Sequence, residues 1–154
     1  MRRRAGFTLI ETLMALAIVS VLSLIAYPRV SSSMTKSNLR GARTQVANML
    51  AAARVTATQG NRSTWVIFNG NVARIEAFPR RTVGGSGTRD TVGTLVNLST
   101  VYGATASLSG GNTQVAYDPR GLATGILNSP LKISLTKNGY TDSVVVDMLG
   151  RVRK

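Results

Sequence analysis

The chain of 154 residues contains no cysteine and no histidine. Without cysteine it has no disulfide bonds, thiolate metal ligands or cysteine nucleophiles, and without histidine it lacks imidazole ligands and the commonest general base. Aromatic residues make up only 5% of the chain. We therefore expect a domain that is stabilised by packing alone and that carries no metal and no other cofactor.

Acidic residues are also scarce: six Asp and Glu stand against 19 Lys and Arg, which gives a formal net charge of +13. The first 28 residues contain Arg2, Arg3, Arg4 and Glu11, so the remainder keeps 16 basic and five acidic residues and a net charge of +11. Such a basic domain favours polyanionic partners such as nucleic acid, anionic lipid or lipopolysaccharide. The alternative is a basic surface that serves only solubility.

The chain offers little for catalysis. Its aspartates are scattered, at Asp90, Asp118, Asp142 and Asp147, and turn or strand-edge roles are favoured over a carboxylate pair or a metal cluster. The run VGGSGT lacks the Lys-Ser/Thr pair of a phosphate-binding loop. We expect no enzyme and no catalytic residue.

An apolar run of 20 residues extends from Phe7 to Ala26 behind three arginines. As a helix it is roughly 30 Å long, enough to cross a bilayer, with the basic end in the cytoplasm and the C-terminal domain on the far side. A cleaved secretory signal has a similar layout but prefers small residues after the apolar run, where Tyr27 and Pro28 stand. Glu11 interrupts the run, and a charge there needs a partner unless it reaches the headgroups.

The stretch RRRAGFTLIETLMALAIVSVL resembles the processing and assembly segment of type IV pilins and type II secretion pseudopilins. The resemblance implies that a prepilin peptidase cuts between Gly6 and Phe7 and that the new amine of Phe7 is methylated. It also implies that Glu11 pairs with the N-terminal ammonium of the same or a neighbouring subunit when other pilins or pseudopilins join it in a filament, so that assembly satisfies the buried charge. We expect a cleaved leader at 1–6 and a transmembrane and filament-core helix at 7–28.

Residues 29–60 continue the helical period beyond Pro28, which is expected to kink the helix. An apolar stripe on one face should lie on a sheet, and it consists of Leu39, Ala42, Val46, Met49, Leu50, Ala53 and Ala57. A basic stripe beside it consists of Lys36, Arg40, Arg43 and Arg54. The sequence leaves open whether this stripe is solvated, binds a polyanion or contacts neighbouring subunits. Gln59, Gly60 and Asn61 are a stop signal.

Residues 61–154 predict a β-rich domain. STWVIF and NVARIEAF flank Asn69 and Gly70, which is a strong hairpin signal. PRRTVGGSGTRDT reads as a Gly-rich loop, and the later strand candidates are GTLVNL, ASLS, TQVAYD, LKISL and SVVVDM. We predict an α+β fold in which one long N-terminal helix packs on antiparallel β-sheet, as in pilins.

Two C-terminal segments, VAYDPRGLATG and MLGRVRK, resemble the GspH/FimT branch of minor pilins and pseudopilins. In that branch Asp118, Pro119 and Gly121 would form a turn between strands. In a strand-like tail, Arg151 and Arg153 would share one side about 7 Å apart, a spacing suited to successive phosphates of one nucleic-acid strand.

GRVR also resembles the Gly-Arg-x-Arg motif of DNA-binding FimT-like minor pilins, which implies DNA contact at Arg151 and Arg153 during uptake for natural transformation. Further DNA contacts are expected at Lys154, Arg120, Arg80, Arg81 and Arg89, and Lys132 and Lys137 are plausible secondary ones.

Two functions therefore share one predicted fold. The first is a non-enzymatic minor type IV pilin that sits in the inner membrane with a periplasmic domain, enters a surface pilus and binds DNA without sequence preference. The alternative is a type II secretion pseudopilin with a structural role in protein secretion.

Overall fold

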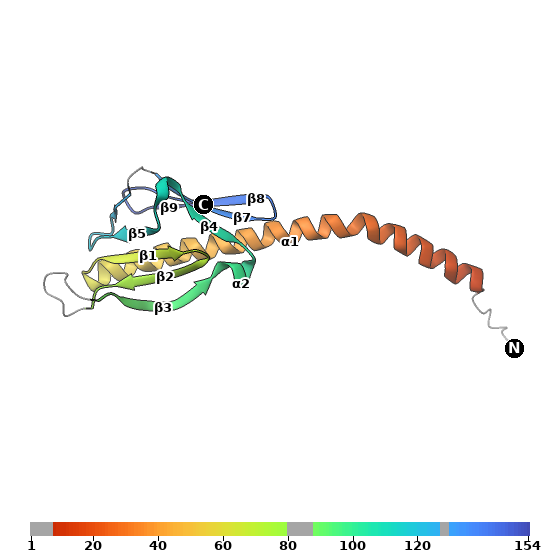
Figure 1. The fold of residues 1–154 in the computed structure, drawn as a ribbon, viewed down its shortest axis with the longest axis horizontal. Coiled ribbons are helices and arrows are strands. Elements are labelled where there is room, and N and C mark those ends of the chain that lie inside the picture. Colours follow the sequence, from red (N-terminus) through yellow and green to blue (C-terminus); the bar gives the residue numbers. More distant parts are fainter. Residues whose placement is uncertain (1–7, 80–87, 127–129) are drawn as a thin grey trace. The chain divides into compact units, whose positions relative to one another are not determined.

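A computed structural model describes residues 8–79, 88–126 and 130–154 of the chain. The chain divides into two compact units, residues 1–35 and residues 36–154. The division lies within helix α1 (Leu9–Gly60), the helix coloured red to yellow in Figure 1. As domain boundaries, the predicted divisions after residues 6, 28 and 60 remain predictions.

The first unit contains an apolar helical segment long enough to cross a membrane. Its most apolar 18-residue window has a mean hydropathy of 2.4, and none of that window is buried within the protein. Large apolar side chains such as Leu13, Ile18 and Leu22 are exposed along it. Pro28 lies inside α1, which continues through it, so the proline does not end the helix.

In the second unit, α1 carries the apolar stripe that the sequence predicts, and every residue of that stripe is buried. These residues are Leu39, Ala42, Val46, Met49, Leu50, Ala53 and Ala57. The helix ends at Gly60, and Asn61 follows with a positive φ of 46°. The N–H of Arg62 donates to the carbonyl oxygen of Ala57 (3.1 Å). The stop signal is confirmed.

The predicted hairpin is formed by β1 (Thr64–Asn69) and β2 (Val72–Ala77). Asn69 pairs with Val72, so the connecting residues are Gly70 and Asn71, one position later than predicted. This register sets Phe68 opposite Ala73, and both side chains are buried. Burial of one face thus fixes the register, because a slip of one residue would turn those side chains to solvent.

The hairpin belongs to an antiparallel five-stranded sheet with the order β3-β2-β1-β5-β6. Its other strands are β3 (Asp90–Asn97), β5 (Gln114–Tyr117) and β6 (Ala123–Thr124). The short helix α2 (Leu98–Tyr102) follows β3 directly. The side chain of Asn97 caps its first N–H groups and Gly103 ends it with a φ of 64°, which explains why the predicted strand GTLVNL stops before Leu98.

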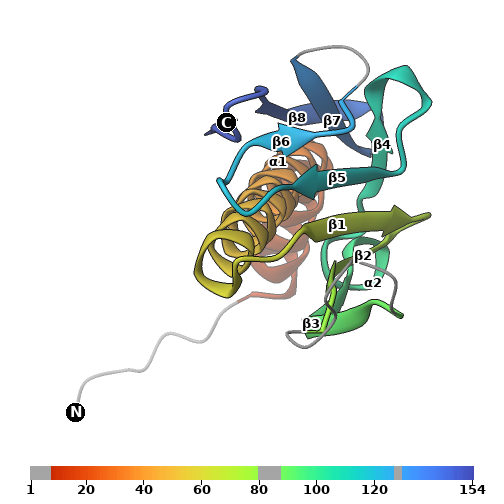
Figure 2. The same cartoon turned by 90° about the vertical axis from the view of Figure 1, so that its left-hand side faces the viewer.

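A second antiparallel sheet has the order β4-β7-β8-β9. Its strands are β4 (Thr105–Leu108), β7 (Leu131–Lys137), β8 (Tyr140–Val146) and β9 (Val152–Arg153). Leu131, Ile133 and Leu135 point into the core from β7. Figure 2 shows the strands of both sheets along one side of the C-terminal half of α1. The predicted α+β fold is confirmed, and the sheet is divided in two.

Candidate nucleic-acid interface

The C-terminal tail starts in a tight turn that follows β8. The N–H of Arg151 donates to Oδ1 of Asp147 (2.8 Å), and the N–H of Gly150 donates to the Asp147 carbonyl oxygen (2.9 Å). The N–H of Asp147 in turn donates to the Arg151 carbonyl oxygen (3.1 Å). Gly150 has a φ of 72°, which glycine adopts without a side-chain penalty. Asp147 therefore fixes the point at which Arg151 leaves the turn.

A second turn, between β5 and β6, repeats these three hydrogen bonds and adds a fourth, from the N–H of Arg120. Oδ1 of Asp118 accepts from the N–H groups of Arg120 and Leu122 (both 2.9 Å). The N–H of Gly121 donates to the carbonyl oxygen of Asp118 (2.9 Å), and the N–H of Asp118 donates to the carbonyl oxygen of Leu122 (3.0 Å). The segments DPRGL and DMLGR are thus two copies of one turn, Asp-x-x-Gly-x, and the predicted turn at Asp118 is confirmed.

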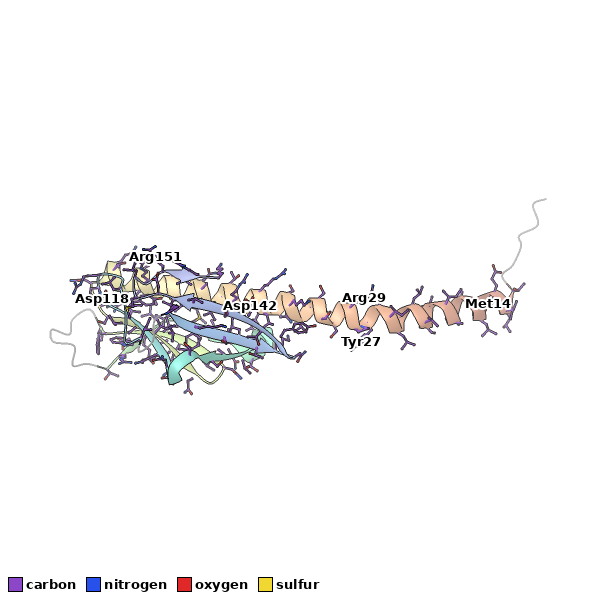
Figure 3. The ribbon with its side chains drawn as sticks, turned by 90° about the horizontal axis from the view of Figure 1, so that it is seen from above. Met14, Tyr27, Arg29, Asp118, Asp142 and Arg151 are labelled. Carbon is purple, nitrogen blue, oxygen red and sulfur yellow. The ribbon has the colours of Figure 1, made fainter. Side chains whose placement is uncertain are left out.

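The two turns pack directly on each other. Both Gly121 and Gly150 are buried, and a β-carbon at Gly150 would overlap the carbonyl oxygen of Gly121. The N–H of Ala123 donates to the carbonyl oxygen of Met148 (3.1 Å). Figure 3 shows Asp118 and Arg151 near the same end of the second unit. The start of the tail is therefore held by the β5–β6 turn.

Arg54 of α1 binds both turns at once. Its Nε donates to the carbonyl oxygen of Gly121 (3.0 Å), and its Nη2 donates to that of Leu149 (3.2 Å). The rigid fork of a guanidinium suits two carbonyl oxygens held at fixed positions. The turns are thereby attached to the long helix as well as to each other.

Tyr117 lies beneath these turns with its ring fully buried, and its Cε1 lies 3.3 Å from where a β-carbon of Gly150 would stand. Its hydroxyl has no hydrogen-bond partner among the described residues. Burial raises the pKa of Tyr117 far above its ordinary value of 10.0, Arg54 opposes that rise, and Asp147 adds to it. The phenol is therefore held in its neutral form.

Two predicted contact residues, Arg120 and Arg151, project from the two matching turns. Their side chains are 84% and 61% exposed, and each lies near the aspartate of its own turn: Nε of Arg120 is 3.6 Å from Asp118 Oδ2, and Nε of Arg151 is 3.9 Å from Asp147 Oδ2. Exposed pairs at such distances are weak, about 0–1 kcal/mol. Both guanidinium groups can therefore exchange these partners for an incoming anion.

The last residues, Arg153 and Lys154, are exposed. Arg153 stands opposite Val145 of β8, and Val152 stands opposite the buried Val146, so Arg153 points away from the core. Since β9 starts at Val152, Arg151 belongs to the preceding turn. That Arg151 and Arg153 share one side stays a prediction.

Arg89, another predicted contact, packs against the five-stranded sheet. Its guanidinium lies over the ring of Trp65, 4.0 Å from the centroid, and its Nη1 is 3.9 Å from Oε2 of Glu76. These two contacts occupy Arg89 within its own domain. The predicted contacts Arg80 and Arg81 lie outside the described residues.

Most of the basic stripe on α1 is also occupied within the domain. Arg43 pairs with Asp142 of β8 (3.2 Å), and the Lys36 ammonium lies 5.2 Å from the centroid of the Tyr140 ring. Arg40 is exposed. Lys137, which lies in β7 and not in this stripe, is occupied as well: its ammonium donates to the carbonyl oxygen of Tyr102 at the end of α2 (2.6 Å). The stripe therefore fastens the helix to the sheets, a role that the sequence alone does not reveal.

Sequence reasoning missed Arg54 as a residue that positions the tail. One signal was available: the pattern Asp-x-x-Gly occurs at Asp118–Gly121 and again at Asp147–Gly150. Two turns of the same kind next to two arginines suggest a repeated structural unit. That a helix residue joins them depends on tertiary packing, which the pattern does not contain.

Comparison with known proteins gives two family matches. Residues 1–27 match the prokaryotic N-terminal methylation motif, and residues 42–150 match the family described as type II transport protein GspH. No curated protein sequence gives a significant match.

Two solved structures share the fold, and both are crystal structures of the type IV minor pilin FimU from Pseudomonas aeruginosa. The first, in space group P65, has a TM-score of 0.56 at 16% identity, and the match covers 75% of this chain and 90% of the FimU chain in that crystal. The second, in space group P21, has a TM-score of 0.55 at 13% identity, and the match covers 77% of this chain and 88% of the FimU chain in that crystal. At such identities the likeness concerns the fold.

Proposed function

The chain belongs to the GspH family, and on that premise we propose that it is a non-enzymatic minor type IV pilin that binds DNA without sequence preference for uptake in natural transformation. Membership of this pilin and pseudopilin family implies assembly with other pilins in a filament. The apolar N-terminal helix and the methylation motif are the parts that anchor such subunits in a membrane before assembly.

The observation that carries the DNA-binding proposal is the group of exposed cations around the paired turns. Arg120 and Arg151 project from them with only weak partners, and Arg153 and Lys154 follow directly in the chain. Guanidinium groups bind phosphate through two parallel hydrogen bonds, and binding to the backbone alone carries no sequence preference. Because Arg54 holds both turns in place, the backbone that carries these cations is fixed relative to α1.

The family description itself favours a second function, that of a type II secretion pseudopilin. In that case the subunit would belong to a secretion filament, and its basic surface would meet other pseudopilins. Binding to duplex DNA separates the two functions, because a structural pseudopilin has no need of it.

DNA binding is tested with the full-length chain in a non-ionic detergent, by fluorescence anisotropy with two unrelated DNA duplexes across a salt series. The double variant Arg151→Gln/Arg153→Gln should bind both duplexes more weakly, and the slope of log K against log salt should fall by roughly 1.4–1.8. The matched control Lys36→Gln/Arg40→Gln removes the same charge from α1 and should retain the parent slope within about 0.5. If the parent chain shows no salt-dependent DNA binding, the pseudopilin function is the better account.

Processing follows from the same proposal. A prepilin peptidase would cut between Gly6 and Phe7 on the cytoplasmic side and leave the second unit in the periplasm. Mass spectrometry of the membrane-extracted protein should find an N-methylated Phe7 terminus. An intact Met1 terminus, or a cut after Ala26, would contradict the pilin assignment of the N-terminal segment.

A further inference from the structure

The outer face of the four-stranded sheet β4-β7-β8-β9 is unusual in composition. Side chains alternate between the faces of a strand, and the buried residues Ile133 and Val144 mark the inner face of β7 and β8. The opposite face is lined by six hydroxyl side chains, two cations and one valine. We call it the hydroxyl face, and it consists of Thr105, Ser107, Lys132, Ser134, Thr136, Thr141, Ser143, Val145 and Arg153.

The strand register places these residues in three rows across the sheet. The rows are Thr105–Thr136–Thr141, Ser107–Ser134–Ser143 and Lys132–Val145–Arg153. Neighbours within a row are about 4.8 Å apart, and successive rows are about 7 Å apart along the strands. Lys132 and Arg153 are therefore two strand spacings, about 10 Å, from each other on the same face.

The hydroxyl face carries positive charge and no acidic residue. Asp142 lies in β8 between Thr141 and Ser143, but its side chain is on the inner side, where it pairs with Arg43. Lys132 and Arg153 are exposed, and within the described ranges neither has an acidic partner. A polyanion would therefore meet two free cations and no repulsive charge.

The hydroxyl groups provide neutral donors beside those cations. The side chains of Ser134 and Ser143 stand opposite each other in the central row, and no hydrogen bond uses either hydroxyl within the described residues. Oγ1 of Thr136 and Oγ1 of Thr141 are 3.4 Å apart, so one donates to the other and the second keeps its proton for an outside acceptor. Ser and Thr hydroxyls are regular donors to phosphate oxygens at protein–DNA interfaces.

We propose that the hydroxyl face is a docking platform for the DNA backbone, with Lys132 and Arg153 binding phosphates and Ser134 and Ser143 donating hydrogen bonds to phosphate oxygens. This inference rests on the proposed DNA-binding function and extends the contact surface from the tail, to which Arg153 itself belongs, across β8 to β7. Charge complementarity favours a polyanion. A neighbouring pilin is a poorer fit, because Val145 is the only apolar side chain among the residues that define the face.

The charged part of the proposal is tested with Lys132→Gln in the full-length chain, by anisotropy across the same salt series. Loss of one phosphate contact should lower the slope of log K against log salt by roughly 0.7–0.9. The matched control is Arg40→Gln, which removes one exposed charge from α1 and should leave the slope unchanged.

The proposed hydrogen bonds from Ser134 and Ser143 should affect affinity but not its salt dependence. Ser134→Ala/Ser143→Ala removes no charge and releases no counterion, so the slope should stay the same while affinity falls at every salt concentration. The loss should be roughly two- to tenfold for each hydroxyl. Ser143→Glu places an acid in the centre of the face and should abolish most of the binding. The control Ser99→Ala/Thr100→Ala removes two exposed hydroxyls from α2 and should leave affinity unchanged.

The outcomes separate this inference from the function on which it rests. If the parent chain binds no DNA, the proposed function and the platform both fail. A second outcome is that the parent binds DNA and the Arg151/Arg153 double variant binds more weakly, but Lys132→Gln and Ser143→Glu bind like the parent. In that case the tail binds DNA alone and the platform is wrong. If Ser143→Glu instead binds DNA normally but no longer enters filaments, the hydroxyl face is a subunit interface. Circular dichroism of each variant checks that the fold is retained.

Discussion

Gly150 packs against the carbonyl oxygen of Gly121 so closely that no β-carbon fits at position 150. Each glycine belongs to an Asp-x-x-Gly turn, and the two turns share hydrogen bonds to Arg54 of α1. The start of the basic tail is thus attached to the rest of the domain at one crowded point. The position of the tail arginines therefore depends on residues outside the tail.

Replacing Gly150 by Ala should destabilise the fold and displace the tail. A left-handed φ costs a non-glycine residue about 1–2 kcal/mol, and overlap with the Gly121 carbonyl should add about 1–3 kcal/mol. The matched control is Gly139→Ala in the β7–β8 turn, where φ is 79° but nothing lies within 4 Å of the added carbon. Thermal unfolding of the full-length chains should rank Gly150→Ala clearly below Gly139→Ala. Equal stability would show that the turns are free to separate.

Arg54→Lys should loosen both turns although it keeps the charge. An ammonium is a point donor on a flexible stem and does not reproduce the fork that reaches the carbonyl oxygens of Gly121 and Leu149. Loss of one charge-assisted hydrogen bond from this partly exposed side chain should lower the free energy of unfolding by about 1–2 kcal/mol. The exposed Arg40→Lys is the control and should change stability by less than about 0.5 kcal/mol. Denaturant unfolding measures both, and equal effects would remove Arg54 from its positioning role.

Much of the fold follows from patterns within single elements. The apolar stripe from Leu39 to Ala57 is buried as predicted, because helical period alone fixes which side chains share a face. The hairpin was predicted one residue too early at Asn69, since turn chemistry allows either position and only the pairing of Phe68 with Ala73 selects one. The division into two sheets was not predicted, because alternation tells which face of a strand is buried but not which strand lies beside it.

The candidate site was predictable in part. The turn at Asp118 and the exposure of Arg120 follow from local sequence. The contacts of Arg43 and Arg54 do not follow from local sequence. A helical wheel gives the direction of each side chain, but the aspartate and the carbonyl oxygens that they bind come from segments roughly 70 to 100 residues later in the chain. Long-range partners of this kind are decided by tertiary packing.

Tyr117→Phe should leave the domain as stable as the parent at neutral pH, or more stable by up to about 1 kcal/mol. The hydroxyl it removes is buried and has no partner within the described part of the chain, and an unsatisfied buried donor is unfavourable. The variant should differ most in alkali. Because burial raises the pKa of Tyr117 above 10.0, the parent binds this proton more tightly when folded, and its stability falls as the pH rises above that value.

Unfolding followed from pH 8 to pH 12 tests this, with the exposed Tyr140→Phe as the control. Tyr117→Phe should flatten the alkaline loss of stability, and Tyr140→Phe should not. A parallel loss in all three proteins would mean that the Tyr117 phenol ionises freely in the fold.

Replacing Glu11 by Ala should impair filament assembly without impairing membrane insertion. Glu11 lies in the first turn of α1, where a negative charge also suits the helix dipole, and its side chain is exposed. Removing a charge from an apolar span makes insertion easier. In a filament, however, the proposed partner, the N-terminal ammonium of Phe7, would be left without its carboxylate in a low-dielectric core, and breaking such a pair costs about 3–5 kcal/mol.

Quantitative immunoblots of membranes and of sheared filaments should show normal membrane levels and a severe loss from filaments. Glu11→Gln, which keeps the shape but not the charge, should fail in the same way, and Thr12→Ala, one residue along the same turn, should assemble normally. Normal incorporation of Glu11→Ala would mean that assembly does not depend on this charge pair.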